Sequence, residues 1–324
     1  MMEVTLKAAD RKKIQIISIG ITAARALVSS RIWRLLSAYD RSFYCIDDDE
    51  NIICFALNGI GRGPFTLLCS GNERLPAGML KAMKYFSVVD DMLVAEGGNL
   101  IIDLNDALTW RESLLDLKEN HHELIENDLS WLAHRASLAA PQESLCWLIP
   151  TFLTGYRCDP LEKHKKISTL LNERVSKVTK KIEKSFAVNG RACELEQLIG
   201  LGYGLTPSGD DFLAGVVMGF HKMQKHQEAM LLAHHFYNKA HGKTTTISFA
   251  FYRALADGRV AEPYMRFLEV IGREDKTKRE NLFDRVTNFG GTSGWDTLAG
   301  IVFGINLVQR SLKRSIEHLS EAVC

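Results

Sequence analysis

A chain of 324 residues with 46% hydrophobic residues can bury a sizeable core and form two domains, which excludes a disordered protein. Its 40 basic and 39 acidic side chains give a net charge of +1, so no global field recruits nucleic acid or an anionic membrane, and any anion site must be local. The seven cysteines are scattered without a C-x-x-C pair, which indicates a reducing, cytoplasmic compartment rather than a disulfide framework or a thiolate zinc site.

The N-terminal third, residues 1–105, predicts a β-rich domain. Its first apolar run follows a basic cluster, as in a secretory signal, but Gln15 and Arg25 interrupt that run. A buried strand over Ile14–Ile19 followed by a helix is the preferred interpretation. Short runs of β-forming residues, bounded by turn residues, then predict strands and hairpins. We interpret the acidic stretch Asp47–Glu50 as a solvated hairpin turn, because a metal loop needs more ligands at wider spacing.

Residues 106–324 predict an all-helical domain, which makes the fold class α+β. Apolar residues recur three and four positions apart directly after Asn105, and Pro141 closes the first helical stretch. Another amphipathic pattern covers residues 160–189, and its apolar face carries Ile167, Leu170, Leu171, Val175, Val178, Ile182 and Phe186. The opposite face is basic but lacks interleaved aromatic residues, so a solvated surface is favoured over a binding face for an acidic partner. Helix breaks are expected at Gly190, Gly242, Gly258 and Gly272. No run of about 18 apolar residues predicts a transmembrane helix.

A glycine-rich motif occurs twice in this helical half. Residues 208–220, SGDDFLAGVVMGF, align without a gap with residues 293–305, SGWDTLAGIVFGI, with seven identical residues. These pairs are Ser208/Ser293, Gly209/Gly294, Asp211/Asp296, Leu213/Leu298, Ala214/Ala299, Gly215/Gly300 and Gly219/Gly304. Ser or Thr in a glycine-rich turn followed by Asp is typical of a helix start. The glycines four residues apart predict two buried helices that pack closely against each other through Gly215, Gly219, Gly300 and Gly304.

These helix starts also predict a ligand site. Gly200, Gly202 and Gly204 are more glycines than a helix cap requires, and the adjacent Asp210 and Asp211 carry more negative charge than a helix dipole needs. Backbone N–H groups at a helix N-terminus bind anions, and a neighbouring carboxylate can orient an amide, act as a base or hold a metal. The plain alternative is that both motifs are only capped helices packed together.

Several better-known motifs are excluded. The stretch GLGYGL has Leu205 where a dinucleotide fingerprint needs glycine, and HGKTT would place Tyr237 at the first glycine of a P-loop. The ten histidines form no H-E-x-x-H motif, and neither Cys146 nor Cys193 lies in a nucleophile signature.

The assembled motifs GLGYGLTPSGDDFLAG, TTTIS and GGTSGWDTLAG resemble the bacterial family typified by AllH, a subunit of oxamate carbamoyltransferase in allantoin degradation, a branch of purine catabolism. The resemblance is specific over about residues 196–305. In the N-terminal half it extends only to a glycine-rich turn, Gly59–Phe65. It implies a subunit of a transferase that moves a carbamoyl group between carbamoyl phosphate and oxamate or a similar small amide acid, with companion subunits as partners.

The resemblance also implies roles for individual residues. Asp210, Asp211 and Asp296 are expected to be catalytic, gripping an amide or acting as a base. The expected substrate-binding residues are Gly202, Gly204, Thr206, Ser208, Gly209, Thr244, Thr245, Ser248, Thr292, Ser293 and Gly294, with Arg62 contributing charge from the N-terminal domain. No cofactor is expected, while a divalent metal such as Mg²⁺ is left open. The rival hypothesis is a non-catalytic subunit that binds a metabolite or supports a complex, favoured by the lack of an obvious nucleophile or general-acid histidine.

Overall fold

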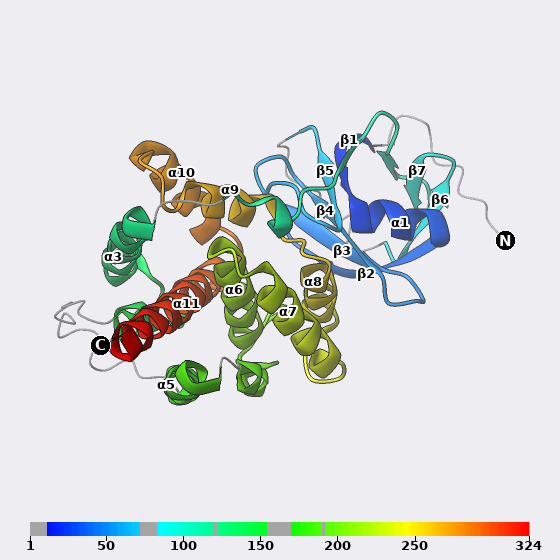
Figure 1. The fold of residues 1–324 in the computed structure, drawn as a ribbon. Helices are drawn as coiled ribbons and strands as arrows, with labels where there is room; N and C mark the ends of the chain where they lie inside the picture. Colours follow the sequence, from blue (N-terminus) through cyan, green and yellow to red (C-terminus); the bar gives the residue numbers. More distant parts are fainter. Residues whose placement is uncertain (1–11, 72–82, 119–121, 154–169, 190–191, 324) are drawn as a thin grey trace. The chain divides into compact units, whose positions relative to one another are not determined.

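The computed structural model describes residues 12–71, 83–118, 122–153, 170–189 and 192–323 (Figure 1). The chain divides into two compact units. The first comprises residues 1–112 with 259–262, and the second comprises residues 113–258 with 263–324. No helix within the described ranges has the length and apolar character needed to cross a membrane.

The first unit is built on one nine-stranded sheet. Its elements are β1 (Lys12–Gly20), α1 (Ile21–Ser29), β2 (Ile32–Ala38), β3 (Ser42–Ile46), β4 (Ile52–Ala56), β5 (Thr66–Cys69), β6 (Tyr85–Val89), β7 (Met92–Ala95), β8 (Leu100–Asp103) and β9 (Leu108–Trp110). The strand order is β5-β4-β3-β2-β6-β7-β8-β1-β9, and β1 also pairs with β5, so the sheet closes on itself. Three aromatic rings fill its interior, with Phe43 stacked on Phe55 at 4.9 Å and on Phe86 at 5.4 Å between ring centroids.

Two N-terminal predictions are confirmed. The run after the basic cluster forms β1 and then α1, as predicted, although β1 is only partly buried, with Ile16 buried and Ile17 exposed. The acidic stretch forms the turn between β3 and β4, in which Asp47 Oδ1 accepts hydrogen bonds from the N–H groups of Asp49 and Asn51 at 3.0 and 2.7 Å. Asp47 is buried while the next three residues are exposed, so the acidic cluster is one turn-forming side chain beside a solvated tip.

The predicted start of helical structure directly after Asn105 is wrong. Leu108–Trp110 form β9, which pairs in parallel with β1 in the register Ser18–Leu108, Ile19–Thr109 and Gly20–Trp110. Pairing with a strand about ninety residues earlier overrides the local helical period, because β-strand formation depends mainly on cross-strand neighbours.

The second unit is helical, and no strand follows β9 in the described residues, which confirms the α+β class. Its elements are η2 (Leu114–Asp116), α3 (His122–Ala139), η3 (Leu145–Leu148), α4 (Ile149–Phe152), α5 (Leu170–Asn189), η5 (Cys193–Leu198), α6 (Ser208–Lys222), α7 (His226–Ala240), α8 (Thr246–Ala256), α9 (Glu262–Val270), α10 (Lys276–Thr287) and α11 (Ser293–Val323). Gly242, Gly258 and Gly272 have positive φ and lie between helices, as predicted. Gly190 lies outside the described residues.

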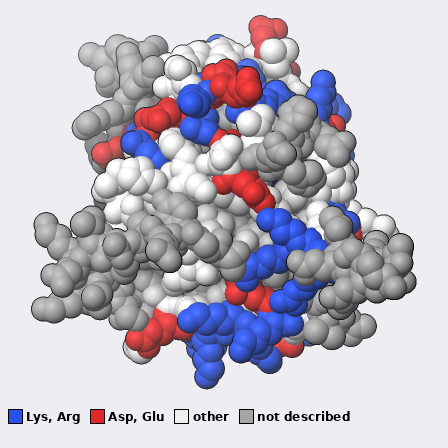
Figure 2. Space-filling view, turned by 60° about the vertical axis from the view of Figure 1, so that its left-hand side comes forward, with Lys and Arg blue, Asp and Glu red and all other residues white. Residues whose placement is uncertain are grey.

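Helix α5 carries the predicted basic face. Val175 and Ile182 are fully buried, whereas Leu170 is 85% exposed, so the prediction of an apolar contact at that position is wrong. Leu170 is the first residue of α5, and Ile167 lies outside the described residues. The basic residues of α5 are exposed, and Figure 2 shows Lys and Arg gathered at the bottom of the molecule, where Figure 1 places this helix.

The two glycine-rich helices pack directly against each other, as predicted. Figure 1 shows α6 and α11 crossing in the middle of the helical unit. A Cβ atom added at Gly215 would lie 2.1 Å from the carbonyl oxygen of Thr297, and one added at Gly300 would lie 2.0 Å from that of Phe212. Gly219 and Gly304 face each other one turn further along. The two helices therefore run together from their N-termini at backbone contact, which a Cβ atom would prevent.

Alanine at these glycines should force the helices apart. Gly215→Ala and Gly300→Ala are each expected to lower the free energy of unfolding by about 1–3 kcal/mol, because overpacking against backbone exceeds the gain in helix propensity. The matched control is Gly291→Ala, since nothing lies within 4 Å of a Cβ atom at that position, and its effect should stay below about 0.5 kcal/mol. Urea unfolding measures all three variants. Equal stability of the helix variants and the control would contradict the predicted backbone contact.

Candidate functional site

The starts of α6 and α11 meet. Each helix follows a glycine turn, with positive φ at Gly200, Gly202 and Gly204 before α6 and at Gly290 before α11. The hydroxyl oxygens of Thr206 and Ser293 lie 2.8 Å apart, within hydrogen-bonding distance. The duplicated motif therefore brings two helix N-termini, and the aspartates in their first turns, to one place.

Two of the predicted binding glycines are explained by chain packing. The N–H of Gly209 donates to the carbonyl of Leu201 at 2.7 Å, and the N–H of Gly294 donates to that of Phe289 at 3.1 Å. A Cβ atom at Gly209 would lie 2.1 Å from the carbonyl oxygen of Leu198, and one at Gly294 would lie 1.9 Å from that of Val286. Both N–H groups are occupied within the chain, so neither is available to an anion in this structure.

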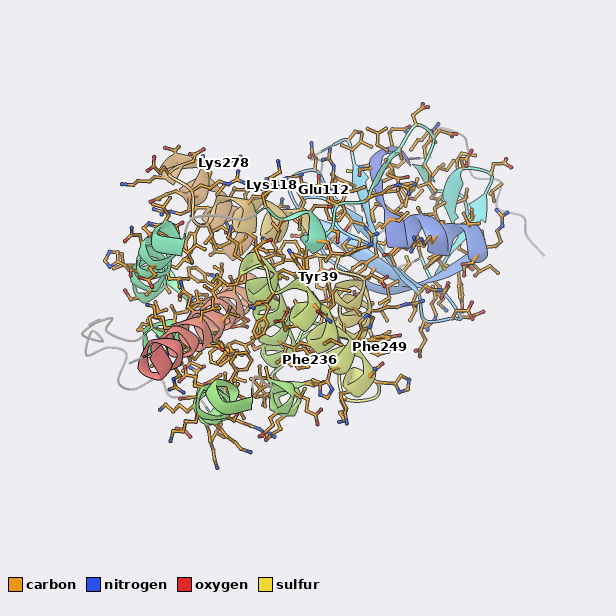
Figure 3. All side chains as sticks on the ribbon, in the orientation of Figure 1. Tyr39, Glu112, Lys118, Phe236, Phe249 and Lys278 are labelled. Atoms are coloured by element: carbon orange, nitrogen blue, oxygen red, sulfur yellow. The ribbon has the colours of Figure 1, made fainter. Side chains whose placement is uncertain are left out.

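Asp210 fastens the loop before α6 to helix α8. Its Oδ1 accepts hydrogen bonds from the N–H of Gly200 and the hydroxyl of Tyr252, both at 2.8 Å. Its Oδ2 accepts a hydrogen bond from the Thr244 hydroxyl. Tyr252 in turn packs edge-on against Phe236 of α7, labelled in Figure 3. Because both carboxylate oxygens are engaged, Asp210 is held as a structural clamp.

Asp211 lies on the other side of the first turn of α6. Its Oδ2 is buried and has no hydrogen-bond partner among the described residues. Burial and, next, the charge of Asp296 raise the pKa of Asp211 well above its ordinary range, while the hydroxyls of Ser293 and Thr206 lower it by hydrogen bonding. An ionised Asp296 therefore disfavours ionisation of Asp211.

Asp296, the equivalent residue of α11, is fully buried. Its Oδ1 accepts a hydrogen bond from the N–H of Leu145 at 2.6 Å, while its Oδ2 is buried without a partner within the described chain. Burial raises the pKa of Asp296 to about 6, although the Leu145 N–H and the hydroxyls of Ser208 and Thr292 act in the opposite direction. At neutral pH this side chain is therefore mostly ionised but easily protonated.

The hydroxyl contacts of the two aspartates are crossed between the motif copies. The Ser208 hydroxyl of the first copy lowers the pKa of Asp296 in the second, and the Ser293 hydroxyl of the second lowers the pKa of Asp211 in the first. Ser208 and Ser293 are equivalent positions of the repeat, as are the two aspartates. Ser208 does not cap α6, because Pro207 occupies the N-cap position and makes no side-chain cap. Each serine instead links one helix start to the carboxyl of the other.

The other predicted residues either hold a neighbouring loop in place, lie at an exposed loop tip or belong to the first unit. Thr245 caps α8 by accepting from the N–H of Ser248 at 3.1 Å, and its hydroxyl donates to the carbonyl of Leu205. Gly204 is exposed at the loop tip, with nothing within 4 Å of an added Cβ atom. Arg62 belongs to the first unit, where its N–H donates to Glu262 at 3.0 Å. Its contribution to the site remains a prediction.

Three contributors were missed by sequence reasoning. Tyr252 holds Asp210, the N–H of Leu145 holds Asp296, and Tyr264 is a buried phenol whose pKa is raised by burial and then by the charges of Asp211 and Asp296. The Leu145 backbone carries no residue-type signal at all. Tyr252 lies at i+4 from the predicted Ser248, so a helical projection of α8 could have suggested it.

The arrangement can bind a group that offers hydrogen bonds to two buried carboxyl oxygens. No Lys, Arg or His in the described part of the chain pairs with either Asp211 or Asp296. The described residues also contain no group of three or more His, Cys, Asp or Glu suited to holding a metal ion. The two orphaned carboxyl oxygens are therefore the chemically unsatisfied feature of this site.

Residues 198–305 match the model of the family described as oxamate carbamoyltransferase subunit AllH. The matched segment begins in η5 and ends in α11, so it contains both helix starts and all three aspartates. The resemblance inferred from the motifs is confirmed over this segment. No solved structure matches the chain.

The raised pKa of Asp296 predicts a pH dependence of stability. An unfolded aspartate titrates near pH 4, whereas Asp296 in the fold titrates near 6. The folded state therefore holds the extra proton, and this stabilising contribution, complete below about pH 4, is lost as the pH rises through about 6. Asp296→Asn cannot lose this contribution, because asparagine does not titrate. The melting temperature of the variant minus that of the wild type should therefore increase between about pH 4.5 and 7.5.

Differential scanning fluorimetry across this pH range measures the effect. The matched control is Asp284→Asn, because Asp284 is a 61% exposed side chain on α10 whose contact with Arg135 is 3.7 Å long. Its melting temperature should keep a constant offset from wild type. Parallel curves for Asp296→Asn and wild type would contradict the assignment.

Proposed function

We propose that this chain is a subunit of a cytoplasmic carbamoyltransferase and that the paired starts of α6 and α11 bind the amide or carbamoyl group of a small anionic substrate. The family description names an oxamate carbamoyltransferase, and we propose oxamate as acceptor and carbamoyl phosphate as donor. The single observation that supports the site is the pair of buried, unpartnered oxygens on Asp211 and Asp296. An amide NH₂ offers the hydrogen-bond donors that these oxygens lack.

The helix ends favour a substrate that also carries negative charge. Each helix N-terminus contributes roughly half a positive charge, and here two of them converge. Since the N–H groups of Gly209 and Gly294 are occupied, the proposed anion contacts rest on the loop residues before each helix and on the Thr206, Thr292 and Ser293 hydroxyls. Gly202 and Gly204 allow the loop to adopt the positive φ values that expose its backbone.

The reaction requires one proton transfer at this site. The amide nitrogen of the acceptor forms a bond to the carbamoyl carbon, the bond between that carbon and the phosphate oxygen breaks, and phosphate leaves. The nitrogen gives up one proton, which an ionised carboxyl of the pair accepts and later releases. A base whose pKa lies near the working pH is suited to this step, and Asp296, with a pKa of about 6, meets that condition.

Companion subunits are part of this proposal, because the family description names a subunit rather than a complete enzyme. The exposed loop tip at Gly204 is a candidate contributor from outside the aspartate pair. Tyr203, between Gly202 and Gly204, is 98% exposed. Its ring is therefore accessible to a substrate or to a companion subunit at the edge of the proposed site.

The test is carbamoyl transfer by the reconstituted complex, followed as phosphate release from carbamoyl phosphate in the presence of oxamate. Asp211→Asn and Asp296→Asn keep the side-chain shape but cannot exchange a proton, so turnover should fall by about 100-fold or more. The free energy of unfolding of Asp211→Asn should change by only about 1 kcal/mol, as for a weakened helix start. Asp284→Asn, at an exposed position of α10, should leave turnover unchanged.

The rival function is a non-catalytic subunit that holds a metabolite or supports the complex. The clamp around Asp210 favours it, because that aspartate has an entirely structural set of contacts. Unchanged turnover of Asp211→Asn together with a large loss of thermal stability would make this rival the better description.

A further inference from the structure

The charges at the two helix starts do not balance. Asp211 and Asp296 would together carry two negative charges in a buried place, and two helix N-termini offset only about one of them. No basic side chain within the described ranges contributes to either carboxyl. A second buried carboxylate without compensation is strongly unfavourable, so one further positive charge is required.

A proton supplies this charge better than a metal ion does. The described residues contain no group of three or more His, Cys, Asp or Glu that could hold a metal ion, whereas a proton needs only the two carboxyls. The surrounding donors are hydroxyls and one backbone N–H, which stabilise a single carboxylate. Asp296 is fully buried, and neither its Oδ2 nor Oδ2 of Asp211 has a hydrogen-bond partner among the described residues. A single proton on one of these two oxygens would supply the missing positive charge.

We infer that Asp211 and Asp296 share a single proton in the resting protein and that this pair selects a primary carboxamide over the corresponding carboxylate. The inference rests on the proposed function for the position of the substrate. A protonated carboxyl donates to the amide oxygen, while the ionised carboxyl accepts from the amide NH₂. A carboxylate in the same place would offer no donor and would face an ionised carboxyl, which is repulsive.

The environment assigns the proton mainly to Asp211. The neighbouring charges of Asp296 and Asp210 raise the pKa of Asp211 further than burial alone does, whereas Asp296 receives the Leu145 N–H and titrates near 6. The titratable groups that face the pair are Asp210 of α6, Cys146 of η3, Tyr252 of α8 and Tyr264 of α9. The pKa values of Cys146, Tyr252 and Tyr264 are all raised, so these three groups stay neutral at the pH values at which Asp296 titrates.

Two pH limits follow. Below about pH 6 Asp296 becomes protonated and no longer accepts from the amide NH₂. At higher pH, once Asp211 ionises above its raised pKa, the shared proton is lost and Asp211 no longer donates to the amide oxygen. Carboxamide binding should therefore be strongest between these two ionisations and decline on either side.

The proton itself is tested without ligand or turnover. Infrared spectra of the full chain at pH 7.5 should show the C=O stretch of a protonated carboxylic acid. The band should be absent from Asp211→Asn, because that substitution removes the protonated carboxyl and Asp296, which titrates near 6, is ionised at this pH. It should persist in Asp284→Asn. A wild-type spectrum without this band would overturn the inference while leaving the proposed function intact.

Ligand selection is tested on the reconstituted complex with oxamate and oxalate, which differ by NH₂ in place of O⁻. Oxamate should bind at least about 100-fold more tightly than oxalate, as expected when a polar site is left unpaired. Oxamate binding by Asp211→Asn should no longer fall at high pH but should still fall at low pH. Binding by Asp296→Asn should show the opposite pattern. Equal binding of the two ligands, or both variants keeping both declines, overturns the inference. Oxamate-independent phosphate release by the complex would instead overturn the proposed function.

Discussion

The backbone contact between α6 and α11 is the constraint on which the helical unit depends. Gly215 and Gly300 face each other so closely that either Cβ atom would meet a carbonyl oxygen at about 2 Å. Helices separated by ordinary side chains would place their axes 8–10 Å apart. The closer approach allows both first turns to share one small volume, and it is why hydroxyls of one copy of the motif reach the carboxyl of the other. The site is therefore a consequence of the packing.

This convergence also explains why the carboxyls are tolerated. A buried aspartate is stabilised by a helix N-terminus, by hydroxyl donors and by backbone N–H groups, and Asp296 has all three. Asp211 has the first two but must also withstand the charge of its neighbour. The unequal environments separate the two ionisations, which is the usual way for paired acids to take different roles. Asp210 takes no part in this division, because Gly200, Thr244 and Tyr252 occupy both its oxygens.

Sequence alone predicted the features that depend on local pattern or on glycine. The spacing of Gly215 and Gly219, repeated at Gly300 and Gly304, was sufficient to predict that α6 and α11 pack together. It could not distinguish Asp210 from Asp211, since adjacent residues on a helix point about 100° apart and only the surrounding fold decides which one is clamped. The short strand β9 was missed because its partner β1 lies far away in the sequence. The contact of Leu145 with Asp296 was equally invisible, because any residue supplies a backbone N–H.

The internal repeat gives an independent argument about which aspartates matter. Position 210 of the first copy corresponds to position 295 of the second, where a buried tryptophan packs edge-on against Phe283. The clamp is therefore specific to one copy and can be replaced by an apolar contact. Asp211 and Asp296, by contrast, occupy equivalent positions, both keep an unpartnered oxygen, and each receives a serine hydroxyl from the opposite copy. Packing alone would be served better by paired oxygens or by apolar side chains at these two positions. Two helix starts that hold two carboxyls with unsatisfied oxygens are explained if a third group, the substrate amide, supplies the missing hydrogen bonds.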